Sequence, residues 1–271
     1  MGKVTLLDGS AGTALWAMAD AVGVKKEPVW KYNIEHPEFV RELHRRYVAA
    51  GCEMIQTNTF EANRPSIARS SDYSVGEVIR AAVSLAKEAV AGTDVQVYAS
   101  FGPLPMLLEP YGKLTVAETA DIYTEMTEAA VEAGAGWIAL ETFMDVQMVK
   151  IAAEAAKKTG AKVICSMTFA KRRRTMMGDN IRKIVDTLSP LGIDAIGMNC
   201  SAGPVEALDI IREYHETTDL PLYFKPNSGV GEAYSAEQFA AEIAPALEFV
   251  SFVGGCCGCD DIYIREIGKL L

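Results

Sequence analysis

The chain contains eight short apolar runs rich in β-branched residues, and helical patterns fill nearly all the gaps between them. The runs are VTLL (4–7), MIQTNT (54–59), VQVYASF (95–101), WIALET (137–142), VICSMTF (163–169), AIGMNC (195–200), LYFKPN (222–227) and VSFVGG (250–255). Strands that alternate with helices are typical of parallel βαβ units, and strands buried on both faces form continuous apolar runs. Eight units in 271 residues fit a closed barrel better than an open doubly wound sheet. We therefore predict the α/β class and a single (β/α)8 TIM barrel that spans residues 1–271 as one domain.

Between the runs, apolar residues recur at spacings of three and four, as on one face of a helix. The clearest sets are Val40, Leu43 and Tyr47 after Pro37; Tyr123, Met126 and Ala130; and Ile181, Ile184, Val185 and Leu188. We expect Asp179 to cap the last of these helices.

Charge and hydropathy limit the partners and the location. The chain has 26 basic and 36 acidic residues, which argues against nucleic acid as a partner because such binding depends on Lys and Arg. The first residues do not resemble a signal peptide, and no segment approaches the ~18 apolar residues of a membrane span. We therefore predict a cytoplasmic protein without a membrane partner. Thiols stay reduced in that compartment, so clustered cysteines are expected to bind metal or to act in catalysis.

Unusual residues follow the predicted strands, where barrels of this kind place their active sites. These residues are Asp8, Gly9, Asn58, Ser100, Gly102, Glu141, Cys200, Asn227, Cys256 and Cys257. Only the strand at 222–227 separates the strands that precede Cys200 and the Cys256–Cys257 pair. We therefore expect the three sulfurs to converge at the mouth of the barrel.

Three converging thiolates suggest zinc, because thiolate is a soft ligand and crowded thiolates repel one another without a cation. Three protein ligands with one open position are typical of a catalytic zinc site. The three histidines fall in helical stretches away from the mouth, so a mixed ligand set is not indicated. Cys259 is predicted to be a bystander, and Cys52 and Cys165 small buried apolar residues.

At these residues the sequence resembles the zinc-dependent homocysteine S-methyltransferases. This family includes betaine–homocysteine methyltransferase and the homocysteine-binding domain of cobalamin-dependent methionine synthase. The resemblance rests on LLDGSAGT, IQTNTFEANR, ETFMD, GMNCSAGP and GGCCG, which together span almost the whole chain. It implies the same barrel fold, with Cys200, Cys256 and Cys257 as ligands of Zn2+. It also implies that Asp8, Gly9 and Glu141 hold the amino acid end of homocysteine.

The expected activity is methylation of homocysteine, or a related thiol, to methionine after zinc has stabilised the thiolate. Glu141 is expected to pair with the substrate ammonium, and Asp8 and the Gly9 backbone with the other end. Alternatively, Glu141 caps the next helix and Asp8 belongs to an ordinary turn. Asn227 is either an extra zinc ligand or a turn residue, and Asn58 and Ser100 either line the pocket or are structural.

The methyl donor stays open between betaine, S-methylmethionine, S-adenosylmethionine and a methylcorrinoid on another protein. The basic segment KRRRTMMG (171–178), including Lys171–Arg174, is either a solvated loop or a docking patch for an acidic corrinoid protein or an anionic donor.

Two other functions are possible for such a chain. It could be a non-catalytic zinc- or thiol-binding subunit of a methyl-transfer complex. It could also be a barrel enzyme that binds phosphate at the glycine-rich turns NSGVGE and GGCCG, although phosphate gives no reason for two adjacent cysteines.

Overall fold

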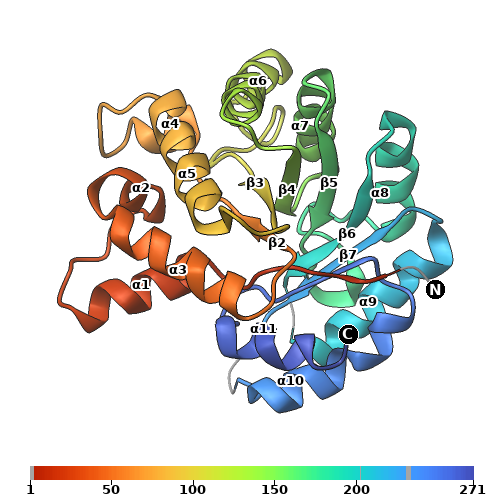
Figure 1. The fold of residues 1–271 in the computed structure, drawn as a ribbon. Coiled ribbons are helices and arrows are strands. Elements are labelled where there is room, and N and C mark those ends of the chain that lie inside the picture. Colours follow the sequence, from red (N-terminus) through yellow and green to blue (C-terminus); the bar gives the residue numbers. More distant parts are fainter. Residues whose placement is uncertain (1–2, 202, 230–232) are drawn as a thin grey trace.

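A computed structural model describes residues 3–201, 203–229 and 233–271. Its strands form one parallel sheet of eight strands in the order β1-β8-β7-β6-β5-β4-β3-β2. A parallel bridge between Leu7 and Met54 joins the two outer strands and closes the sheet. Helices surround the sheet on its outer side (Figure 1). The predicted (β/α)8 barrel is confirmed.

Each predicted run contains or overlaps one strand. The strands are β1 (Thr5–Leu6), β2 (Met54–Gln56), β3 (Gln96–Phe101), β4 (Trp137–Phe143), β5 (Lys162–Met167), β6 (Ala195–Cys200), β7 (Leu222–Pro226) and β8 (Phe252–Val253). Nearly all of their residues are buried, which explains the continuous apolar runs.

The amphipathic stretches form the outer helices. They are α1 (Gly12–Ala21), α2 (Tyr32–Glu35), α3 (Pro37–Ala49), α4 (Arg64–Ile67), α5 (Val75–Val90), α6 (Val116–Glu132), α7 (Val146–Lys158), α8 (Ile181–Leu188), α9 (Pro204–Thr217), α10 (Ala236–Ile243) and α11 (Asp261–Gly268). No helix in the described ranges is long and apolar enough to cross a membrane.

The helix start predicted at Pro37 is confirmed, but the cap predicted at Asp179 is wrong. Asn180 caps α8, because its side chain accepts a hydrogen bond from Lys183 N at 2.9 Å. The Asp179 carboxylate instead accepts from Val146 N at 3.3 Å and pairs with the Lys183 ammonium.

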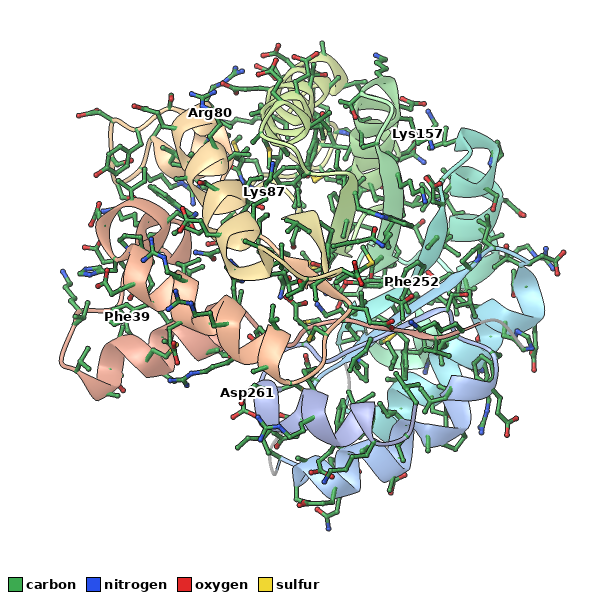
Figure 2. All side chains as sticks on the ribbon, viewed as in Figure 1. Phe39, Arg80, Lys87, Lys157, Phe252 and Asp261 are labelled. Atoms are coloured by element: carbon green, nitrogen blue, oxygen red, sulfur yellow. The ribbon has the colours of Figure 1, made fainter. Side chains whose placement is uncertain are left out.

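The barrel interior changes from apolar to polar along the strands, and this change positions the site. One layer of inward side chains is largely apolar: Leu7, Met54, Tyr98, Ala139, Ile164, Ala195, Tyr223 and Phe252. Trp137 packs edge-on against Phe252 with ring centroids 5.7 Å apart. Figure 2 places Phe252 among the strands and Lys157 on the outer helices.

Further along several strands the inward side chains are polar, because alternate residues of a strand face the same side. Ser100, Glu141, Ser166 and Lys225 lie two residues beyond the apolar layer, and Asn199 lies four residues beyond Ala195. Each of these five side chains is buried. The packed apolar layer therefore forms the floor, and the polar layer faces the open end.

Candidate metal centre

The structure brings the three predicted cysteine sulfurs together at the C-terminal end of the barrel. Cys200 ends β6, while Cys256 and Cys257 follow β8. The Cys200 sulfur lies 3.3 Å from that of Cys256 and 3.5 Å from that of Cys257. Among the described residues this is the one cluster of at least three His, Cys, Asp or Glu ligand atoms that could hold a metal ion.

The backbone around the sulfurs is held in unusual conformations. Cys200 and Ser201 have φ values of 58° and 66°, a region that L-residues adopt only when the surroundings hold them there. The Ser201 hydroxyl provides such a restraint, because it accepts a hydrogen bond from Phe169 N at 2.7 Å. Gly258 also has a positive φ, and a Cβ there would lie 2.1 Å from Ser228 Oγ.

Asn227, the possible extra ligand, joins the loops that follow β7 and β8. Its Oδ1 accepts a hydrogen bond from Cys257 N at 3.1 Å. The atom that could bind metal is therefore close to the cluster and already engaged. A ligand role for Asn227 stays a prediction.

The three thiols differ in proton affinity because they share hydrogen bonds. Contacts with Cys200 and then Cys256 hold the pKa of Cys257 at about 3. Contacts with Cys256 and Cys257, followed by burial, raise the pKa of Cys200 above its ordinary value. Three thiolates this close would repel one another, so a bound cation would stabilise them.

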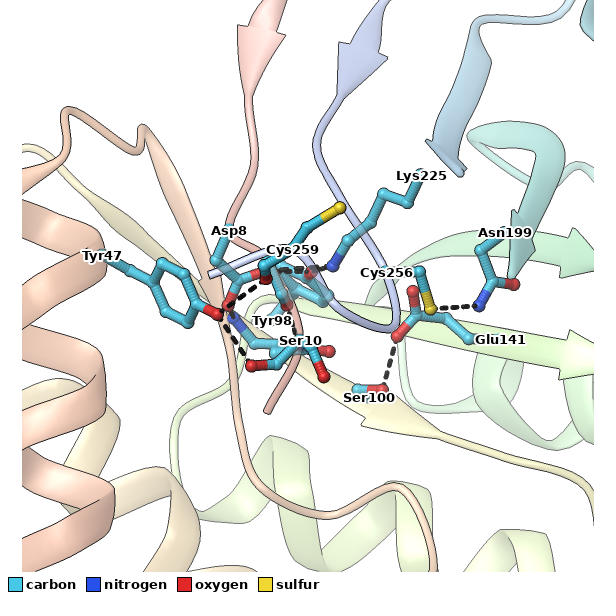
Figure 3. A network of polar contacts seen from close by, with 12 residues as sticks. Asp8, Ser10, Tyr47, Tyr98, Ser100, Glu141, Asn199, Lys225, Cys256 and Cys259 are labelled. Carbon is cyan, nitrogen blue, oxygen red and sulfur yellow. Dashed lines mark hydrogen bonds and ion pairs between the residues drawn. The ribbon is translucent and has the colours of Figure 1, made fainter. Parts of the chain in front are cut away.

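Asn199 supports the cluster and was not predicted from the sequence. Its Nδ2 lies 3.7 Å from the Cys256 sulfur and donates to Thr142 Oγ1 at 2.7 Å. Its Oδ1 accepts from Thr142 N at 2.8 Å and from Ser166 Oγ at 2.7 Å. The amide thus connects β4, β5 and β6 to one sulfur. Figure 3 shows its contact with Cys256. The feature of the sequence that could have identified Asn199 is its place directly before Cys200 at the end of the run AIGMNC.

A cavity of about 260 Å³ lies beside the sulfurs. It is lined by Gly9, Ser10, Ala11, Gly12, Thr13, Trp16, Val29, Gln56, Thr57, Asn58, Thr59, Phe60, Glu61, Glu141, Thr142, Asn199, Cys200, Lys225, Gly255, Cys256 and Cys257. Asn58 belongs to the wall, but its amide donates to Val29 O at 2.7 Å and to Asn33 Oδ1 at 3.1 Å, which ties loops together.

Glu141 brings a buried carboxylate to the cavity. Ser100 Oγ donates to it at 2.5 Å, and the Tyr223 hydroxyl donates to its other oxygen. The alternative that Glu141 caps the next helix is wrong, because Asp145 caps α7 by accepting from Gln147 N at 2.8 Å.

Asp8 is fully buried and is not among the residues that line the cavity. Its carboxylate accepts from Gln56 N at 2.7 Å, from the Tyr98 hydroxyl at 2.8 Å and from Lys225 Nζ at 3.1 Å. These partners come from β2, β3 and β7, so Asp8 is not an ordinary turn residue. Its contact with substrate stays a prediction.

Lys225 was missed in the sequence because it lies inside the apolar run LYFKPN. It lines the cavity, and its Nζ donates to Asp8 and, at 2.8 Å, to the Tyr98 hydroxyl (Figure 3). Burial lowers the pKa of Lys225, but the carboxylates of Asp8 and Glu141 raise it by more. The buried side chain is therefore an ammonium ion.

Gly9 lines the cavity, its contact with substrate stays a prediction, and the fold requires glycine there. A Cβ on Gly9 would lie 2.3 Å from the carbonyl oxygen of Cys259. Cys259 itself is buried outside the cluster, which fits its prediction as a bystander. The prediction that Cys52 and Cys165 are buried is confirmed.

The basic segment after β5 is partly neutralised by its surroundings. Arg173 pairs with Glu213 of α9 at 3.2 Å, and Arg174 Nη1 donates to Gly178 O at 2.9 Å. No histidine of the described residues belongs to the sulfur cluster. His44 and His215 lie in α3 and α9, and His36 lies between α2 and α3.

Comparisons with known proteins agree with this geometry. The family model described as homocysteine S-methyltransferase matches residues 5–271. The chain is 30% identical over 299 residues to methionine synthase of Mycobacterium tuberculosis, covering 98% of this chain and 24% of the relative. It is 29% identical over 265 residues to methionine synthase of Mycobacterium leprae, covering 87% of this chain and 21% of the relative. The chain thus spans about a quarter of the length of these relatives.

The homocysteine methyltransferase MmuM from Escherichia coli has the same fold. Its oxidised form superposes with a TM-score of 0.83 at 24% identity, covering 98% of this chain and 95% of MmuM. Its metallated form gives a TM-score of 0.81. Since the family match covers nearly the whole barrel, including all three cysteines, the chain belongs to the homocysteine S-methyltransferase family.

Proposed function

We propose that residues 1–271 form one methyltransferase domain that binds Zn2+, activates homocysteine or a related thiol as a thiolate, and methylates it to methionine. The observation that carries this proposal is the convergence of three cysteine sulfurs beside a cavity that also contains a buried carboxylate and a buried ammonium. The family assignment replaces the alternative of a phosphate-binding barrel enzyme.

The donor set fits zinc. Three sulfurs within 4.8 Å of one another match the soft ligands that zinc prefers. Bound there, Zn2+ would supply a Lewis acid that keeps a substrate thiol deprotonated near neutral pH. A reducing compartment such as the cytoplasm would keep the ligand thiols free.

The chain's own residues orient the substrate. Glu141 has acceptor capacity left beside Ser100 and Tyr223, so it can pair with the substrate ammonium. Trp16, Val29 and Phe60 contribute apolar groups to the cavity wall and exclude water from the reacting sulfur. Asn227 would have to exchange its bond with Cys257 N for a bond to the metal in order to act as an extra ligand.

The open end of the barrel is where a methyl donor would approach. Most exposed large apolar side chains of the described residues lie in loops after strands or in the N-terminal halves of helices, which is the same end. They are Trp16, Met106, Leu107, Tyr111, Val116, Met176, Val205 and Ile262. Such a rim favours a protein-borne donor, such as a methylcorrinoid on a partner, over a free small molecule.

The test supplies the zinc-loaded protein with homocysteine and each donor in turn: betaine, S-methylmethionine, S-adenosylmethionine and a methylcorrinoid protein. We expect methionine from one of them, and we expect Cys256→Ala to lose zinc and activity together. A Cys256→Ala protein that keeps both would contradict the assignment. Stoichiometric zinc without methionine from any donor would instead favour the non-catalytic binding subunit.

A further inference from the structure

The cavity presents two opposite charges that are both buried. Glu141 is 3% exposed, and the side chain of Lys225 is 2% exposed. Both residues line the same space as the cysteine sulfurs. A buried lysine is rare, and this one lies on β7, two residues beyond the apolar floor residue Tyr223.

Lys225 has hydrogen-bonding capacity that the protein does not use. An ammonium group has three N–H donors. Two are directed at Asp8 Oδ1 (3.1 Å) and at the Tyr98 hydroxyl (2.8 Å). The described part of the chain offers the third donor no acceptor within hydrogen-bond distance. A ligand oxygen in the cavity would complete the set.

Asp8 and Tyr98 hold this ammonium from below. The Asp8 carboxylate also accepts from Gln56 N at 2.7 Å and from the Tyr98 hydroxyl at 2.8 Å, so its position is fixed from β2 and β3. Figure 3 shows the Lys225 amine directed at this pair. Asp8 would repel a substrate carboxylate by itself, but its charge is balanced by Lys225.

We propose that Lys225 binds the carboxylate of the thiol substrate and thereby makes the site selective for thiols that carry an α-amino acid group. This inference rests on the proposed function. Glu141 binds the ammonium of the same group, so the two buried charged side chains bind the two oppositely charged groups of the amino acid. Asp8 is then a positioning residue that acts through Lys225 and does not touch the substrate.

The experiment measures thiol binding to the zinc-loaded protein by calorimetry, which does not depend on the methyl donor. Three thiols with the same spacing between the sulfur and the charged groups are compared: homocysteine, 3-aminopropane-1-thiol without the carboxylate, and 4-mercaptobutanoate without the ammonium. For the wild type we expect 3-aminopropane-1-thiol to bind at least about tenfold more weakly than homocysteine, as for loss of a charge-assisted hydrogen bond.

Lys225→Met should weaken homocysteine binding by a similar factor and leave 3-aminopropane-1-thiol nearly unchanged. Lys225→Met alone leaves the buried Asp8 carboxylate without its counterion. The double variant Asp8→Asn with Lys225→Met removes both charges and should show the same loss of preference for homocysteine over 3-aminopropane-1-thiol. Lys157→Met on the outer helix α7 is the matched control and should bind all three thiols as the wild type does.

If the wild type binds 3-aminopropane-1-thiol as tightly as homocysteine, or if the double variant keeps the wild-type preference, Lys225 does not read the carboxylate. The wild-type comparison can overturn the inference even if both Lys225 variants fail to fold, and the variants assign the carboxylate contact to Lys225. If the wild type binds none of the three thiols, the proposed function fails, and this inference fails with it.

Discussion

At the residue scale, side chains outside the predicted ligand set control the chemistry of the site. Asn199 contacts one sulfur and three groups on neighbouring strands. The cysteines stood out in the sequence because three sulfurs near glycines have no structural explanation. Asn199 did not, since an amide at a strand end is equally typical of a turn.

Replacing Asn199 by Ala should weaken zinc binding by about 10–100-fold, as for other residues that orient metal ligands. Competitive metal titration measures this change. The control is Asn180→Ala, which removes the cap of α8 at a cost of about 1 kcal/mol in stability but should leave zinc affinity unchanged. Equal zinc affinity of the two variants would contradict the role of Asn199.

His44 predicts a pH dependence of stability. It is buried, and neither ring nitrogen has a partner in the described part of the chain. Burial lowers its pKa to about 4, and the charge of Asp8 only partly opposes this effect. The unfolded chain, with a His pKa of ~6.5, therefore binds the proton first as the pH falls. The stability that the protein has with a neutral, buried His44 is therefore fully present above pH ~6.5 and is lost progressively as the pH falls toward ~4.

Between pH 7 and pH 5 this loss amounts to about 2 kcal/mol, at ~1.4 kcal/mol per unit. His44→Leu should not show this loss. When the pH is lowered from 7 to 5, the wild type should therefore lose about 2 kcal/mol more of its unfolding free energy than the variant does. Urea unfolding at both pH values measures the difference. Parallel pH profiles for the two proteins would show that His44 is not the group responsible.

At the scale of elements, a buried ion pair joins the segment that follows β1 to β7, with only β8 between these two strands in the sheet. Asp8 and Lys225 are 217 positions apart in the chain. Periodicity located the strands because each is buried on both faces, as in VICSMTF. It could not reveal this pair, because a lysine within an apolar run is informative only when its partner is known. The cap of α8 was misplaced for a similar reason, since Asp179 and Asn180 have equal capping propensity and only geometry separates them.

Asp8→Ala should destabilise the protein by about 3–5 kcal/mol, because it leaves the Lys225 ammonium buried without its counterion. Denaturant unfolding measures the free energy. Asp8→Asn combined with Lys225→Met should lose less, since neither charge remains. A loss below about 1 kcal/mol for Asp8→Ala would mean that the pair does not anchor the two strands.

At the scale of the whole molecule, the barrel has a packed floor and an open, functional end. The sulfurs, the cavity and most exposed apolar side chains all lie at this end. The basic segment after β5 leads toward the same end, so a partner that approaches the cavity would meet it. Sequence reasoning located this face because strand direction alone determines which loops share it.

Charge reversal of Arg172, Arg173 and Arg174 to Glu tests whether this segment docks a donor protein. If the donor is an acidic corrinoid protein, the apparent Michaelis constant for it should rise several-fold, and the rise should shrink at high salt. The Michaelis constant for homocysteine is the internal control and should not change. An unchanged constant for the donor protein removes the docking role and leaves a solvated loop.

The central claim is that Cys200, Cys256 and Cys257 together hold one zinc ion and leave one position for a substrate thiol. Zinc X-ray absorption spectroscopy of the loaded protein, with and without homocysteine, measures this directly. We predict three sulfur neighbours at about 2.3 Å without homocysteine and four with it. Fewer than three sulfurs in the free protein, or no gain of sulfur when homocysteine is added, would contradict the claim.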